Sequence, residues 1–140
     1  MDLVIEWSDK TEWSDFLLMV RAIRGATTVE SNNEQEILGR TCELLQSMTE
    51  QNGIIKDDII SVIFSVTTDL NAAFPAVAAR RLGWTDIALM STYEIDVPGS
   101  LQKCIRVLMH LNTEKSNREL KFIYLKDARK LRPDLFEQNL

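Results

Sequence analysis

The chain has 140 residues, of which 45% are hydrophobic, and it carries a net charge of −5 at pH 7. This length and composition fit one packed domain and argue against a disordered chain. The sequence has no run of about 20 apolar residues, so a membrane-spanning helix is not expected. An acidic chain without a basic face is also a poor candidate for binding nucleic acid. A small anionic ligand remains possible, because a few converging arginines can bind one.

Residues 1–18 carry most of the negative charge and show no clear hydrophobic period, whereas a regular pattern begins at Met19. We therefore expect an N-terminal extension over 1–18, a domain over 19–135 and a tail over 136–140. A short element packed on the domain is the alternative for 1–18. The acidic start lacks the basic region of a secretory signal, and Cys42 and Cys104 form no CxxC motif. Free thiols and a cytoplasmic location are predicted.

The first half of the domain predicts one strand and one long helix. Residues 20–24 read as a strand that stops at Gly25. Ser31 and Glu34 have the spacing of a capping box at the start of a helix, and Gly53 supplies the stop. Between these signals, apolar and small side chains recur at helical spacing, at Ile37, Leu38, Thr41, Leu44, Leu45 and Met48.

The second half predicts four strands and one short helix. Strands are expected over residues 59–66, 87–90, 103–113 and 121–125, and the first of them is expected to be buried on both faces. A helix over 76–82 follows Pro75 and ends at Gly83.

These elements predict an α/β (α+β) fold, a mixed five-stranded sheet with one long and one short helix. Two helices of this size cannot cover both faces of such a sheet. The face that carries Arg106 and His110 is therefore expected to need another subunit, so the chain should form oligomers.

No standard catalytic motif is present, since GxGxxG, Walker A, HExxH and GxSxG patterns are all missing from the sequence. His110 is the only histidine, which excludes a multi-histidine metal site within one chain. A structural or surface role is the simpler interpretation of this residue. The sequence thus predicts no metal, no cofactor and no covalent nucleophile.

Four charged residues stand at or near the ends of predicted elements: Arg24, Glu94, Arg106 and Arg132. Each of them, taken singly, is more typical of a solvated surface charge than of a site. Arg106 differs because it lies within a strand among apolar neighbours, where burying an unpaired charge is costly. It should therefore face a counter-ion, a cleft or a partner.

Six blocks span the predicted domain and carry a further signal: residues 20–30, 68–76, 94–97, 103–107, 124–125 and 131–135. Together these blocks resemble the monofunctional, trimeric bacterial chorismate mutases of the pseudo-α/β-barrel class. They occur in the order of that family.

The resemblance implies a homotrimer, a trimeric pseudo-α/β barrel with active sites in clefts between subunits. The implied reaction is the rearrangement of chorismate to prephenate, without metal or cofactor, in aromatic amino-acid biosynthesis. Arg106, Glu94 and Arg24 match the catalytic residues. The substrate-binding positions that match are Arg24, Phe74, Ala76, Arg80, Met90, Ser91, Thr92, Tyr93, Glu94, Arg106, Tyr124 and Arg132.

The chain departs from the family at two of its positions. Ser91 stands where members often have cysteine, and Val77 where they often have lysine. Val77 removes a cation at the rim of the site. This change puts the attraction of the substrate in doubt, but not the catalytic step. Two other functions stay open: a trimer that binds a small dicarboxylate without converting it, and a trimeric imine deaminase of similar architecture.

Overall fold

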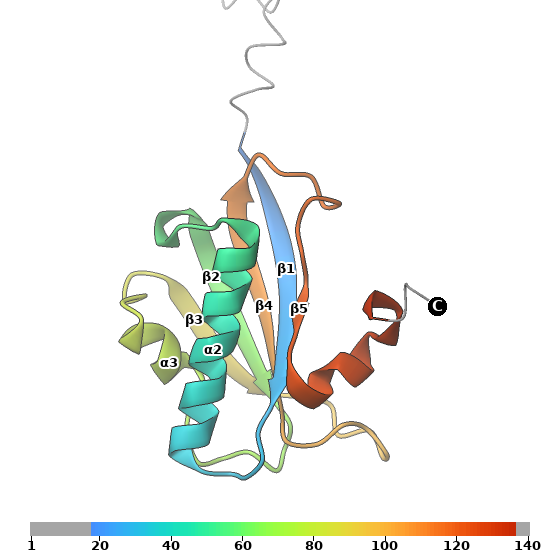
Figure 1. The fold of residues 1–140 in the computed structure, drawn as a ribbon. Helices are drawn as coiled ribbons and strands as arrows, with labels where there is room; N and C mark the ends of the chain where they lie inside the picture. Colours follow the sequence, from blue (N-terminus) through green and yellow to red (C-terminus); the bar gives the residue numbers. More distant parts are fainter. Residues whose placement is uncertain (1–17, 137–140) are drawn as a thin grey trace, which may run out of the picture.

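The computed structural model describes residues 18–136, in which a five-stranded mixed sheet carries two α-helices on one face (Figure 1). The order of strands across the sheet is β3-β2-β4-β1-β5. Strands β1 and β2 both pair antiparallel with β4, while β3 and β5 are parallel edge strands. The elements are β1 (Met19–Thr28), α2 (Glu34–Asn52), β2 (Ile59–Val66), α3 (Ala76–Arg81), β3 (Ala88–Tyr93), β4 (Cys104–Thr113) and β5 (Ile123–Tyr124).

The predicted fold class is confirmed, and within residues 18–136 three short 3₁₀ helices add to it. They are η2 (Lys56–Asp58), η3 (Lys126–Leu131) and η4 (Pro133–Leu135). The predicted N-terminal extension, apart from its last residue, and most of the predicted tail lie outside the described residues. No helix in the described part of the chain is both long enough and apolar enough to cross a membrane.

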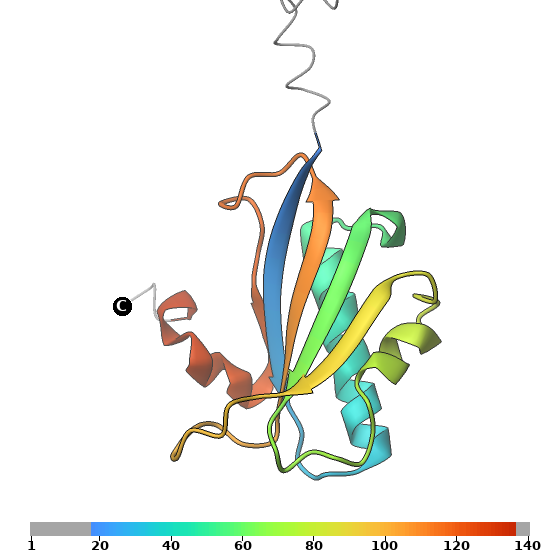
Figure 2. The ribbon, with the colours of Figure 1, turned by 180° about the vertical axis from the view of Figure 1, so that it is seen from behind.

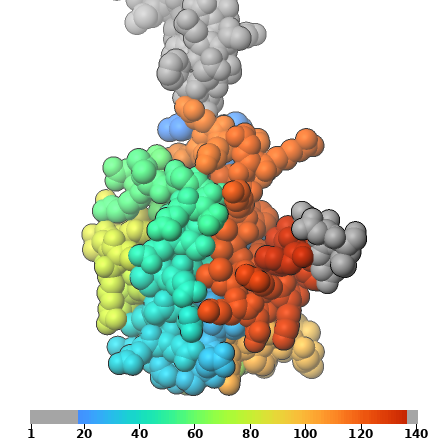
Figure 3. Space-filling model, viewed as in Figure 1, coloured from blue at the N-terminus to red at the C-terminus, as the bar shows by residue number. Residues whose placement is uncertain are grey.

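The core lies between the sheet and α2, the helix that covers the sheet in Figure 3. Alternate residues of β4 point to this side, because successive side chains of a strand face opposite ways. They pack against the apolar stripe that the helical spacing predicts on α2. The buried side chains at this contact include Leu44, Leu45, Met48, Val107, Met109 and Leu111.

Gly25 does not end the first strand, as the sequence suggested, but lies inside β1. A side chain at this position would point at α2, where an added Cβ would lie 2.5 Å from Met48 Sδ and 3.1 Å from Leu44 Cδ1. The glycine is therefore explained by close helix–strand packing rather than by a turn, and the strand continues to Thr28.

The start of the long helix also differs from the prediction. Asn33, not Ser31, is the N-cap residue, and its side-chain oxygen accepts a hydrogen bond from the backbone N–H of Glu36 at 2.8 Å. Ser31 instead donates to the Glu36 carboxylate. The expected end at Gly53 is confirmed, since this residue has the left-handed φ of 61° that suits glycine.

Besides β1, three further strands differ from the prediction in burial or length. β2 alternates between buried and more exposed residues and is not buried on both faces, because the helices cover only one of them. β3 runs on to Tyr93, since it pairs with β2 to the end of that strand. β5 is reduced to Ile123 and Tyr124 because only these residues pair with β1.

The opposite face of the sheet is not covered by α2 or α3, which lie behind the strands in Figure 2. Among residues 18–136, the C-terminal segment with η3 and η4 is the only part that covers it, at one end. There the buried residues Ala26, Cys104, Tyr124 and Ala128 form a small cluster. We call the side of the sheet turned away from α2 the open face.

Candidate active site

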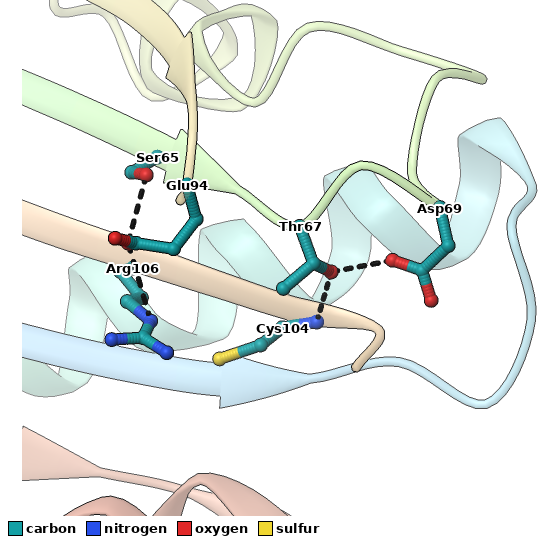
Figure 4. Close-up of polar contacts among 6 residues, drawn as sticks. All are labelled: Ser65, Thr67, Asp69, Glu94, Cys104 and Arg106. Atoms are coloured by element: carbon teal, nitrogen blue, oxygen red, sulfur yellow. Dashed lines mark hydrogen bonds and ion pairs between the residues drawn. The ribbon is translucent and has the colours of Figure 1, made fainter. Parts of the chain in front are cut away.

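An ion pair between Arg106 and Glu94 lies on the open face (Figure 4). Arg106 Nε is 3.4 Å from Glu94 Oε2, and the two side chains are 21% and 28% exposed. The geometry does not make a hydrogen bond, so the buried Nε–H remains without a hydrogen-bond acceptor in the described residues. A half-buried cation that keeps free donors can bind an additional negatively charged oxygen.

The register of the strands explains this pairing. Arg106 lies opposite Ser65 of β2, and Ser65 in turn lies opposite Thr92 of β3. The chain continues beyond β3 with Glu94, whose backbone N–H donates to the carbonyl of Val66 at 2.8 Å. Strand β2, which lies between β3 and β4, thus brings the end of one edge strand close to β4.

Arg24 and Tyr124 lie on the same face as this ion pair. Arg24 is exposed and occupies a position diagonal to Arg106, because its neighbour across the ladder is Leu108 while Arg106 pairs with Ala26. Diagonal Cα atoms in a sheet are roughly 7–8 Å apart, within reach of two long side chains. Tyr124 lies opposite Ala26 in β5 and is buried. The sheet therefore places Arg24, Glu94, Arg106 and Tyr124, four of the substrate-binding positions that the resemblance implies, on one face.

Arg132 lies in the C-terminal segment that covers one end of the open face. Its guanidinium makes two hydrogen bonds to Asp134, from Nε at 3.0 Å and from Nη2 at 2.9 Å. This contact raises the pKa of Arg132 and lowers the pKa of Asp134. The buried hydroxyl of Tyr124 lies near the same guanidinium without forming a hydrogen bond. Arg132 is thus already bound to a carboxylate within its own turn.

A second group of the predicted residues lies around an apolar hollow of about 340 Å³ at the end of β3. Phe74, Ser91, Thr92 and Tyr93 are among its lining residues. Phe74 is 71% exposed, which is unusual for so large an apolar side chain. The Ser91 hydroxyl is buried and has no hydrogen-bond partner in residues 18–136.

The two groups of residues face different sides of the sheet. Ser91 and Tyr93 alternate with Thr92 and Glu94 along an extended segment, so their side chains point to opposite faces. Within one chain, the hollow and the Arg106–Glu94 pair therefore cannot both contact the same ligand.

The remaining predicted residues have varied surroundings. Met90 is exposed on β3, and Arg80 is exposed on α3. The side chain of Ala76 is buried in the main core, so this position offers a ligand only its backbone. Val77, at the position of the missing lysine, is partly buried on α3.

A polar network beside the ion pair was not anticipated from the sequence. Thr67 donates to Asp69, and its hydroxyl oxygen accepts the backbone N–H of Cys104 at 3.0 Å (Figure 4). Asp69 also accepts the N–H of Lys103 at 2.9 Å. Burial raises the pKa of the Cys104 thiol, against an opposing effect of nearby Arg106. These bonds fix the start of β4, which carries Arg106 two residues later.

Ser65 is a further site residue that the sequence reasoning missed. Its hydroxyl donates to Glu94 Oε2 at 3.0 Å. The only available signal was the pair Ser61 and Ser65, which lie four residues apart in a strand and so on the same face, and this by itself indicates only a partly exposed strand face. No group of three or more histidine, cysteine, aspartate or glutamate side chains gathers as metal ligands would within the part of the chain described.

Comparison with known proteins identifies the family. A family model described as chorismate mutase type I matches residues 20–135. The chain belongs to this family. The sequence resemblance is thereby confirmed, and neither alternative function is favoured by it.

Relatives and a solved structure match nearly their whole length. The protein named chorismate mutase AroH from Bacillus subtilis (strain 168) is 44% identical over 119 residues, which are 84% of this chain and 94% of that protein. Its namesake from Thermus thermophilus is 48% identical over 118 residues, with 84% and 97% covered. The structure titled chorismate mutase from Clostridium thermocellum Cth-682 is 59% identical with a TM-score of 0.78, and the match covers 79% of this chain and 98% of that one.

Proposed function

We propose that this protein is an isomerase that rearranges chorismate to prephenate, a step of aromatic amino-acid biosynthesis. The observation that carries the proposal is the Arg106–Glu94 pair, in which a half-buried guanidinium keeps unused donors beside a carboxylate. Membership of the chorismate mutase family and the names of the relatives support it.

The reaction breaks a carbon–oxygen bond while a carbon–carbon bond forms within one molecule. No proton needs to be transferred, and no nucleophile is required. The protein has two tasks, to hold the flexible side chain of the substrate in its reactive shape and to stabilise the charge that separates as the ether bond lengthens. A site built from arginines and one carboxylate suits both tasks.

Four polar residues of the open face, Arg24, Glu94, Arg106 and Tyr124, have roles in this mechanism. Arg106 donates to the ether oxygen as negative charge grows there, a contact that strengthens in the transition state and therefore accelerates the reaction. Glu94 accepts the hydrogen bond of the ring hydroxyl and lies near the electron-poor ring. Arg24 and Tyr124 bind carboxylate.

The remaining residues complete the site. Phe74 supplies an apolar wall, and the segment 90–93 supplies polar and backbone contacts. Arg80 attracts the dianionic substrate, and Arg132 closes over it with the C-terminal segment.

We also propose that the active enzyme is a homotrimer whose sites lie between neighbouring subunits, and that it works in the cytoplasm. Two observations support this assembly. The open face is uncovered by α2 and α3, and several large apolar side chains near it are exposed, among them Met90 and Val20. The hollow beside Phe74 and the Arg106–Glu94 pair face different sides of one chain, so a second copy would be needed to bring both to one ligand.

The test is the ultraviolet assay of chorismate disappearance, run on the full chain and on a version that starts at Met19. We expect turnover by both versions, with prephenate as the product. Binding of chorismate without conversion at micromolar enzyme would instead indicate a silent binding protein. Release of ammonia from an imine without loss of chorismate would indicate a deaminase.

The assembly needs its own measurement. Sedimentation equilibrium should give a mass three times that of one chain. Mixing an Arg106→Ala chain with a Phe74→Ala chain should restore some activity, because a site between subunits can combine the intact residues of both. A lack of restored activity in proven mixed trimers would contradict shared sites.

A further inference from the structure

Ser65 occupies a central position on the open face. It lies on β2, opposite Arg106 on one side and opposite Thr92 on the other. Its side chain is partly buried, and its hydroxyl points towards the Glu94 carboxylate (Figure 4). This serine therefore lies between β4, which carries Arg106, and the end of β3, which Glu94 follows.

Two consecutive residues of β2 hold Glu94 from both ends. The carbonyl of Val66 accepts the backbone N–H of Glu94 at 2.8 Å, and the Ser65 hydroxyl donates to its Oε2 atom at 3.0 Å. Strand β3 ends at Tyr93, one residue earlier. The Val66 bond fixes the backbone, but it leaves the rotation of the glutamate side chain free, so the serine bond determines where the carboxylate lies.

The position of the carboxylate matters because the same oxygen faces Arg106. Glu94 Oε2 is 3.4 Å from Arg106 Nε, and the two groups form an ion pair but no hydrogen bond. An unrestrained carboxylate next to a guanidinium tends to form two short parallel hydrogen bonds with it. Such a fork would occupy the donors that the arginine must offer to another oxygen.

We infer that Ser65 is a positioning residue, which holds the Glu94 carboxylate away from Arg106 and so keeps the arginine donors free for the substrate. The inference rests on the proposed function and adds to it a residue that touches the glutamate rather than the substrate. It also explains why the ion pair of this site is long although both partners are half-buried.

Removing the hydroxyl should lower kcat and leave KM nearly unchanged, because the arginine contact strengthens only in the transition state. We expect Ser65→Ala to reduce kcat by about 10- to 100-fold, the range for one lost hydrogen bond to a charged group. Ser65→Thr retains a hydroxyl and should recover most of this loss. If Ser65→Ala does not fold, Ser65→Cys keeps the size of the side chain with only a weak donor, and the same loss is expected.

The matched control is Ser61→Ala. Ser61 lies on the same face of the same strand and is also partly buried, but its hydroxyl contacts His110 Nδ1 at 3.2 Å instead of a site residue. The same truncation there should leave kcat and KM unchanged. A loss of kcat in Ser61→Ala equal to that in Ser65→Ala would mean that any change on this strand face disturbs the enzyme, and the inference would be overturned.

A measurement without substrate separates this inference from the proposed function. In the free protein, the Arg106 Nε–H signal in proton–nitrogen NMR should move downfield and exchange more slowly in Ser65→Ala, because the released carboxylate forms the fork. Inactive wild-type enzyme would contradict the proposed function while this spectrum still tests the serine. Active wild-type enzyme together with an unchanged signal and unchanged kcat in Ser65→Ala would refute the inference alone.

Discussion

Replacing Arg106 by alanine tests the central electrostatic step of the proposed mechanism. The Arg106 side chain is 21% exposed, and its guanidinium makes no hydrogen bond within the described residues, so the Nη donors remain free for a ligand while Nε itself is buried. The variant removes those donors and also leaves Glu94 without its counter-charge. Both changes weaken the stabilisation of the ether oxygen as it becomes negative.

The expected loss follows from these contacts. Removing one preorganised donor from an oxyanion site costs about 10²- to 10³-fold in kcat. The additional loss of the ion pair places the prediction for Arg106→Ala at the upper end, at least about 10³-fold or roughly 4 kcal/mol. Arg106→Lys should be severely impaired as well, because an ammonium group cannot reproduce the forked donors of the guanidinium.

The assay is steady-state loss of chorismate absorbance, accompanied by sedimentation to show that each variant keeps the assembly of the wild type. Arg40→Ala is the matched control, since this arginine pairs with Glu43 on the surface of α2 and should be dispensable. Near-normal turnover by a folded, assembled Arg106→Ala enzyme would refute the role assigned to the arginine.

Other perturbations test the remaining features. Gly25→Ala should lower the free energy of unfolding by about 1–3 kcal/mol, because the new Cβ would lie 2.5 Å from Met48 Sδ. Urea unfolding can measure this loss, and the loss should be smaller when Gly25→Ala is made in a Met48→Ala background. Chelators should leave activity unchanged, and kcat should vary little around neutral pH; a sharp bell-shaped profile there would indicate acid–base chemistry. Arg132 lowers the pKa of Asp134, so their ion pair should stabilise the C-terminal turn at neutral pH. This stabilisation should be lost below about pH 4, where Asp134 becomes protonated, and amide exchange at Phe136 can measure the loss.

The charged residues could be found from the sequence, but their geometry could not. Arg106 was recognisable because a cation inside an apolar strand needs a partner. The other charged residues were predicted from the resemblance of the sequence blocks to the family. The pairing of Arg106 with Glu94 depends on the order β3-β2-β4. Strand β2, which precedes both residues in the chain, lies between the strands that carry or lead to them. The role of Ser65 could not be predicted for the same reason, since this role exists only once the two neighbouring strands are in register.

The sequence by itself determined the elements, because hydrophobic period, capping residues and turn residues act over a few neighbouring positions. Thus the helix that ends at Gly53 and the strand over 59–66 follow from local patterns. Only the tertiary structure decided what depends on contacts between distant segments. Gly25 is indistinguishable from a strand stop until α2 packs on it, and the open face appears only when the helices have covered the other side. Local propensity cannot encode such contacts, because they arise from packing of the whole chain.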